Sequence, residues 1–167
     1  MAEENQEQID YWNNRAGKTW TELQESTDQL LHPFSQEAIA VAEIKPNEKV
    51  LDVGCGCGAT SLAISELGAA VTGIDVSMPM LDLAKKRAEK VSFIETDAST
   101  YQSDQKFDLV FSRFGVMFFS DPYKAFSNLH SIAADHGRLA FVCWQSPQKN
   151  PWMAIPGPVS YTHLTLP

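Results

Sequence analysis

The chain has 167 residues, the size of a single domain with one sizeable core. Hydrophobic residues make up 44% and charged residues 20% of it, a composition typical of globular proteins and not of disordered chains. The formal net charge is -8, so the average electrostatic field repels phosphate, and we expect neither nucleic acid nor an anionic membrane as a partner.

The cellular compartment is also constrained by composition. Three cysteines cannot all pair within one chain, which favours a reducing, cytoplasmic location. The sequence holds no run of about 18 uncharged apolar residues, the length that a transmembrane helix requires. The first ten residues are acidic and polar, unlike a signal peptide.

The first 45 residues are predicted to be helical. Residues 6–31 indicate one or two helices, interrupted at Gly17 and ended by Pro33, because the residue before a proline avoids helical dihedral angles. Another helix is expected over residues 35–43, with Ser35 as its N-cap. This segment forms either a lid that excludes water from a ligand or an ordinary packed helix. Its expected apolar anchors are Tyr11, Trp12, Trp20, Leu23, Leu30 and Leu31.

From residue 46 onward, short apolar strands alternate with helical stretches. Strands are expected over residues 49–53, 70–75, 91–95, 107–112 and 138–144, with helices over 59–67, 77–90 and 121–133. Ser77 is the expected cap of the second of these helices. The alternation predicts an α/β, Rossmann-like doubly wound parallel sheet with helices on both faces, within a domain spanning residues 46–158.

In such a sheet, ligands bind outside the carboxyl ends of the strands. Gly54, Gly56 and Gly58 follow the first strand directly and open a helix, so the backbone there can approach a ligand closely. The glycine pattern is shared by several cofactor sites and does not by itself choose among them. Cys55 and Cys57 lie between the glycines, but two thiols at this spacing do not make a tetrahedral zinc site.

Three acidic residues end successive strands at this same edge. Asp52, just before the glycines, would repel a pyrophosphate but would suit a ligand that carries an ammonium and a sulfonium, such as S-adenosylmethionine. Asp75, at the end of the second strand, can accept hydrogen bonds from both hydroxyls of a ribose. Asp97, after the third strand, can accept from an adenine amino group, and the Ala98 amide can donate to a ring nitrogen.

These segments together resemble the class I S-adenosylmethionine-dependent methyltransferases. The resemblance rests on residues 50–58, 73–77, 96–98, 107–112 and 137–139, and the flanking segments 11–13 and 150–152 resemble a bacterial small-molecule subgroup related to quinone-biosynthesis enzymes. It implies that the three glycines pack against the methionine part of the cofactor and that Asp75 holds the ribose. It also places Val76 or Met80 near the adenine and Ser112 and Arg113 on the floor beside the reactive methyl.

The expected function is methyl transfer from S-adenosylmethionine to a small-molecule acceptor. An NAD(P)-dependent oxidoreductase and a non-catalytic domain that binds a cofactor or a partner remain as alternatives. The sequence identifies neither a general base nor the oligomeric state. The apolar segment 113–119 is either a wall of the acceptor pocket or core packing.

The end of the chain departs from the pattern. Methyltransferases of this class carry further strands after the fifth, whereas prolines dominate residues 147–158 here. Residues 159–167 resemble a translated sequencing adaptor. We therefore expect the natural protein to continue beyond residue 158, residues 159–167 to be a non-native tail that packs on nothing, and the fifth strand to be an exposed edge.

Overall fold

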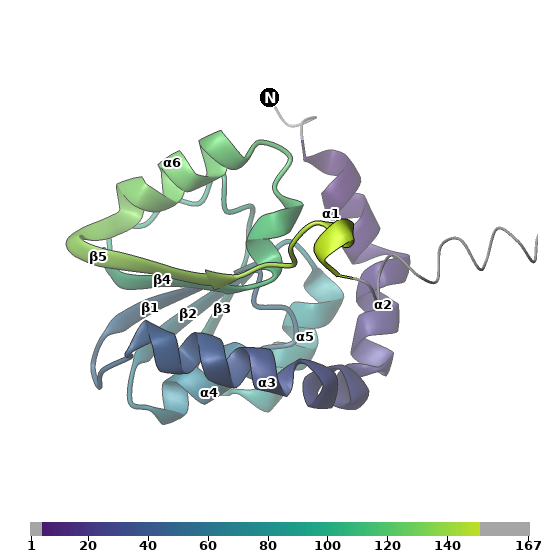
Figure 1. The fold of residues 1–167 in the computed structure, drawn as a ribbon, viewed down its shortest axis with the longest axis horizontal. Coiled ribbons are helices and arrows are strands. Elements are labelled where there is room, and N and C mark those ends of the chain that lie inside the picture. Colours follow the sequence, from purple (N-terminus) through teal and green to yellow (C-terminus); the bar gives the residue numbers. More distant parts are fainter. Residues whose placement is uncertain (1–4, 151–167) are drawn as a thin grey trace, which may run out of the picture.

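The computed structural model describes residues 5–150. Its centre is a sheet of five parallel strands in the order β3-β2-β1-β4-β5 (Figure 1). The strands are β1 (Lys49–Val53), β2 (Ala70–Asp75), β3 (Ser92–Glu95), β4 (Phe107–Arg113) and β5 (Ala133–Val142). The predicted doubly wound α/β fold is confirmed. The expected non-native tail, residues 159–167, lies outside the described residues.

Helices cover both faces of the sheet. One face carries α3 (Gln24–Ala42), α4 (Ala59–Glu66) and α5 (Met78–Arg87), and the opposite face carries α6 (Pro122–Ile132) (Figure 1). Two short helices, α1 (Gln6–Asn13) and α2 (Arg15–Glu22), lie at one end of the molecule, where α2 contacts α5. Single 3-10 turns follow β4 (η1, Gly115–Phe118) and β5 (η2, Pro147–Lys149).

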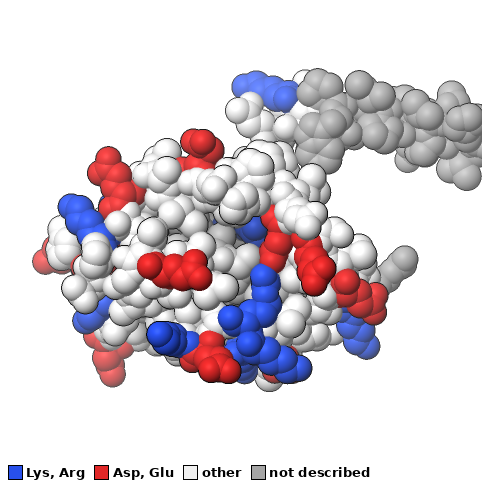
Figure 2. Space-filling model, turned by 90° about the horizontal axis from the view of Figure 1, so that it is seen from below, with Lys and Arg blue, Asp and Glu red and all other residues white. Residues whose placement is uncertain are grey.

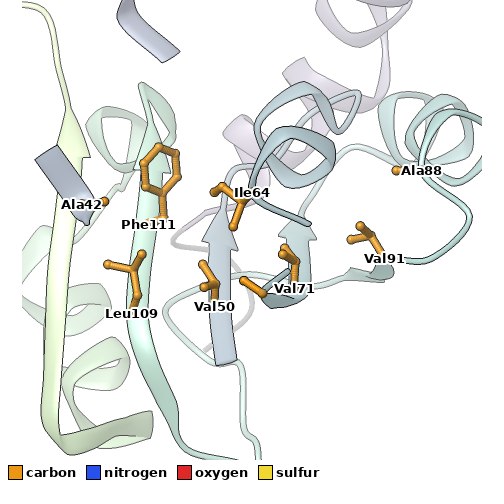
Figure 3. Packing of buried hydrophobic residues seen from close by; sticks show 9 residues of the cluster. Ala42, Val50, Ile64, Val71, Ala88, Val91, Leu109 and Phe111 are labelled. Carbon is orange, nitrogen blue, oxygen red and sulfur yellow. The ribbon is translucent and has the colours of Figure 1, made fainter. Parts of the chain in front are cut away.

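Successive residues of the central strands face opposite sides, so each face has its own core. Val50 and Leu109 pack with Ile64 of α4 on one face (Figure 3). Leu51 packs with Leu129 of α6 on the other face. From Val50 onward β1 is buried on both sides, and this part of the strand is apolar except for Asp52.

The N-terminal helices differ from the prediction. Pro33 does not end a helix: α3 continues through it to Ala42, where Glu43 takes a left-handed conformation with φ 47°. The predicted cap Ser35 instead lies inside α3, and its hydroxyl donates to the Leu31 carbonyl over 3.1 Å. Gly17 does not interrupt a helix either but lies within α2. Packing of α3 against β4 and β5 outweighs the local cost of the proline.

Three of the predicted apolar anchors are wrong. Tyr11, Leu23 and Leu30 are 57%, 55% and 72% exposed, whereas Leu31 is buried. The prediction for the last strand, residues 138–144, is also wrong in its bounds, because β5 begins at Ala133 and ends at Val142. It pairs with the start of β4, and the pairing register then shifts between Phe107 and Leu109.

The edge of the sheet at β5 is partly uncovered. Leu139 and Phe141 are each about half exposed, as expected for an edge strand.

On the face that carries α3 and α4, acidic and basic side chains are intermixed (Figure 2). Within residues 5–150, no helix is long and apolar enough to cross a membrane.

Arg138 of β5 joins three elements at the amino end of the sheet. Its two terminal nitrogens donate to the two carboxylate oxygens of Glu48 over 2.8 and 2.7 Å, and its Nε donates to the Ala42 carbonyl over 3.0 Å. Paired planar groups of this kind form the strong class of charge-assisted hydrogen bonds. The hydrogen bonds from Arg138 lower the pKa of the Glu48 carboxyl to about 2.

The pair predicts a pH-dependent loss of stability in Glu48→Gln. A lowered folded-state pKa contributes stability above the ordinary carboxyl value of 4.5, and that contribution disappears as the pH falls towards 2. Urea unfolding at pH 7 should therefore show Glu48→Gln about 1 kcal/mol less stable than the wild type, with the gap closing between pH 4.5 and 2. Glu66→Gln, at an exposed site, is the control, and a gap independent of pH would contradict the assignment.

Candidate functional site

A cavity opens at the carboxyl ends of β1 to β4 and is closed over by α1 and α2. The empty space within it, counted together with the part that opens to solvent, is about 850 Å³. The predicted site residues that line it are Gly54, Gly56, Asp75, Val76, Met80, Asp97, Ala98 and Arg113. Asp52, Gly58 and Ser112 do not line it.

Two glycine backbones meet at the floor of the cavity. A Cβ at Gly54 would lie 2.7 Å from the Gly115 Cα, and a Cβ at Gly115 would lie 2.6 Å from the Val53 carbonyl oxygen. Neither position accommodates a side chain without moving backbone, and Gly54 also has a φ of 68°. The loop after β1 and the turn after β4 therefore form one continuous surface.

Asp75 is oriented by backbone amides. The Gly56 amide donates to its Oδ2 over 2.8 Å, and the Ser77 amide donates to its Oδ1 over 2.9 Å. Burial raises the pKa of the Asp75 carboxyl, and these two donors oppose the rise. Each carboxylate oxygen keeps a further lone pair, so the group can still accept from a ligand hydroxyl.

Asp97 links the cavity to the first described residue of the chain. Its Oδ1 accepts from the Ser99 amide over 2.8 Å, and its Oδ2 accepts from the Asn5 side-chain amide over 2.6 Å. Asn5 also accepts a hydrogen bond from the Ser120 hydroxyl over 2.7 Å. The carboxylate that the sequence assigns to adenine is thus in contact with the N-terminal segment.

Asp52 lies behind the loop. It is fully buried on β1, and its Oδ2 accepts from the hydroxyls of Thr60 and Ser61 on α4 over 2.7 and 2.6 Å. Burial raises the pKa of its carboxyl against the effect of these donors. The group ties the end of β1 to the helix that follows the glycines.

Gly58 and Ser112 also support the cavity from outside. Gly58 is the N-cap of α4, and a Cβ there would lie 3.0 Å from the side chains of Ala84 and Phe93. The Ser112 hydroxyl donates to the Val53 carbonyl over 2.8 Å and accepts from the Val116 amide over 3.2 Å. Ser112 therefore joins the ends of β1 and β4.

The loop cysteines are buried. Burial raises the pKa of the Cys57 thiol to about 12 and that of Cys55 well above its ordinary value, which makes both thiols poor nucleophiles. Within residues 5–150, no group of three or more His, Cys, Asp or Glu side chains is placed to hold a metal ion.

The N-terminal helices are docked on the strand ends by polar and aromatic contacts. Trp12 makes edge-to-face contacts with Trp20 and Phe118, with ring centroids 5.9 and 5.2 Å apart. Ser77 is the N-cap of α5, but its hydroxyl makes no cap hydrogen bond and donates to the Trp12 carbonyl over 2.7 Å. A Cβ at Gly17 would lie 2.0 Å from that carbonyl oxygen, so only glycine allows α1, α2 and α5 to meet there.

The segment after β4 both lines the cavity and packs in the core. Arg113, Phe114 and Phe118 line the cavity, while Val116 is buried in the core under α6. Sequence reasoning missed Asn5 and Gln8, which also line the cavity. No local pattern marks them, because tertiary docking of the N-terminal helices brings them there.

Comparison with known proteins identifies the family. Residues 51–141, more than half of the chain, match the family described as "Methyltransferase domain". The chain is 32% identical over 108 residues to trans-aconitate 2-methyltransferase of Escherichia coli, covering 64% of this chain and 43% of that protein. It is 35% identical over 123 residues to demethylmenaquinone methyltransferase of Thermus thermophilus, covering 70% and 56%.

A solved structure shows the same likeness. A SAM-dependent methyltransferase from Geobacter sulfurreducens in complex with S-adenosyl-L-homocysteine superposes with a TM-score of 0.57 at 27% identity, covering 65% of this chain and 47% of that one. The chain belongs to the methyltransferase domain family. It spans about half the length of the curated relatives it matches.

The backbone contact at the cavity floor makes Gly115→Ala informative. The added methyl meets the Val53 carbonyl and the Gly54 Cα, so we expect a loss of about 1–3 kcal/mol in unfolding free energy and weaker binding of S-adenosylhomocysteine. Met117→Ala, in the same turn but 41% exposed, should leave both quantities nearly unchanged. Urea unfolding and calorimetry measure the two effects, and wild-type behaviour of Gly115→Ala would contradict the described packing.

Proposed function

We propose that the protein transfers the methyl group of S-adenosylmethionine to a small-molecule acceptor. The observation that carries this proposal is the order of groups along the sheet. Asp97 follows β3, Asp75 is the last residue of β2, and the loop at Gly54 follows β1; these strands are neighbours in that order. An adenine, a ribose and a methionine chain are linked in the same order, so one extended ligand can meet all three groups.

The chain supplies different contacts along this row. Asp97 and the Ala98 amide would hold the adenine edge, with Val76 and Met80 beside the ring. Asp75, held by two backbone amides, would accept from the ribose hydroxyls. The backbone at Gly54 and Gly56 would contact the methionine part. Asp52 would not touch the ligand; its carboxylate would place a negative charge behind the glycine loop and fix α4 through the Thr60 and Ser61 hydroxyls.

The chemistry of methyl transfer suits a site that aligns reactants. The cofactor supplies a methyl on a sulfonium: a lone pair of the acceptor forms the new bond to carbon, and the carbon–sulfur pair returns to sulfur. Alignment of two reactants contributes about 7–11 kcal/mol to such a step. Trp12, Phe114 and Phe118 line the cavity with apolar surface that would keep water from a bound sulfonium, which would favour a transition state in which that charge disperses.

The acceptor is proposed only as a small molecule. Trans-aconitate 2-methyltransferase and demethylmenaquinone methyltransferase, by their names, act on very different acceptors, so family membership supports the methyl donor better than any one acceptor. The free state of Cys55, Cys57 and Cys143 supports a cytoplasmic location.

Binding specificity tests the proposal against its rivals. Thermal unfolding should shift upward with S-adenosylhomocysteine and not with NAD or NADP, because ligand bound only to the folded state stabilises it. Transfer from labelled S-adenosylmethionine to a panel of small acceptors then separates an enzyme from a non-catalytic binding domain. Stabilisation by NAD alone would replace the proposal with an oxidoreductase.

The ribose assignment predicts the effect of Asp75→Ala. Hydrogen bonds to a charged acceptor contribute about 1.5–3 kcal/mol, so calorimetry should show S-adenosylhomocysteine binding weakened by roughly ten- to hundredfold. Glu95→Ala is the matched control, because Glu95 lies beside Asp75 in the strand register but is exposed and outside the cavity. Equal affinity in Asp75→Ala and the wild type would remove Asp75 from the ribose site.

A further inference from the structure

Arg113 lies toward the end of the sheet edge opposite to the two acidic residues of the cavity. It ends β4, the strand on the far side of β1 from β2 and β3. Three strand spacings of about 4.8 Å separate it from the end of β3, or roughly 14 Å. Among the described residues that line the cavity, Arg113 is the one Lys or Arg, whereas Asp75 and Asp97 lie toward the opposite end.

The guanidinium of Arg113 is incompletely partnered. Its Nη1 donates to the Ser35 hydroxyl over 3.1 Å, and its buried Nε has no hydrogen-bond partner within the described structure. A guanidinium carries five N–H donors, and burying a cation without an anion is costly. Burial accordingly lowers the pKa of this group.

The other arginines whose side chains the structure describes are paired. Arg87 forms an ion pair with Asp28 and donates to the Cys57 carbonyl, and Arg138 forms its pair with Glu48. Arg113, in contrast, forms no ion pair with any residue between 5 and 150. Asp52 is the nearby acid whose charge acts on it most, but the Asp52 carboxylate accepts from Thr60 and Ser61 instead.

We propose that the Arg113 guanidinium binds a carboxylate of a ligand in the cavity. This inference rests on the proposed function, which supplies two sources of that carboxylate. One is the methionine part of the methyl donor, which the row of strand ends directs toward β4. The other is an acidic acceptor placed beside the methyl group. In both cases the ligand supplies an anion that residues 5–150 do not provide.

The experiment compares ligands that differ by one group. Calorimetry measures S-adenosylhomocysteine and its analogue that lacks only the carboxylate, on the wild type and on Arg113→Gln. Succinate, with succinamide as its uncharged counterpart, is then titrated into each protein saturated with S-adenosylhomocysteine. Arg113→Lys retains the charge, and Lys85→Gln removes an exposed positive charge from α5, outside the cavity.

Two results support the inference and identify the source. If the carboxylate belongs to the methyl donor, Arg113→Gln weakens S-adenosylhomocysteine by about ten- to hundredfold and leaves the decarboxylated analogue unchanged. If it belongs to the acceptor, both adenosyl ligands bind normally and the preference for succinate over succinamide is lost. In either case Arg113→Lys restores part of the effect, and Lys85→Gln resembles the wild type.

The inference is overturned if Arg113→Gln has a wild-type melting curve and still binds S-adenosylhomocysteine better than the analogue without the carboxylate, and succinate better than succinamide, as the wild type does. It is also overturned if the variant weakens all ligands equally, because Arg113 then acts on the fold through its hydrogen bond to Ser35. A wild-type protein that binds neither adenosyl ligand contradicts the proposed function instead. The two failures are therefore distinguishable.

Discussion

The cavity depends on the approach of two backbones where β1 and β4 end. Gly54 and Gly115 leave no room for a Cβ between them, and the Ser112 hydroxyl bridges the same two strand ends. With side chains absent from this contact, the peptide groups of both loops form the cavity floor. A larger residue would separate β1 from β4 at the point where the proposed methionine site meets Arg113.

The charged groups around that floor are held in different ways. Asp75 is oriented by the amides of Gly56 and Ser77, so its position follows from the backbone path of two loops. Asp52 is buried in the layer behind and depends on two hydroxyls of α4. Arg113, the one Lys or Arg among the described residues that line the cavity, forms no ion pair within residues 5–150. Asp52 therefore supports the loop from behind, whereas Asp75 and Arg113 line the cavity where a ligand would lie.

The parts predictable from sequence are those governed by local pattern. The strands at residues 49–53 and 70–75 have the predicted bounds, because apolar runs ended by glycine or aspartate specify them locally. Asp121 caps α6 as a helix start signal predicts. Tertiary contacts decided the rest: packing carried α3 through Pro33, pairing with β4 extended β5 back to Ala133, and docking of α1 brought Asn5 to Asp97.

The hydrogen bond between Asn5 and Asp97 joins residues 92 positions apart in the chain. The cavity walls come from the N-terminal helices and from the ends of four strands, so they span the chain from Asn5 to Phe119. Parallel topologies built from such distant contacts fold slowly, because loop closure precedes the stabilising contacts. Occupancy of the cavity consequently reports that the N-terminal helices have docked on the ends of β1 to β4, and in refolding it should appear in the same kinetic phase as burial of Trp12 and Trp20.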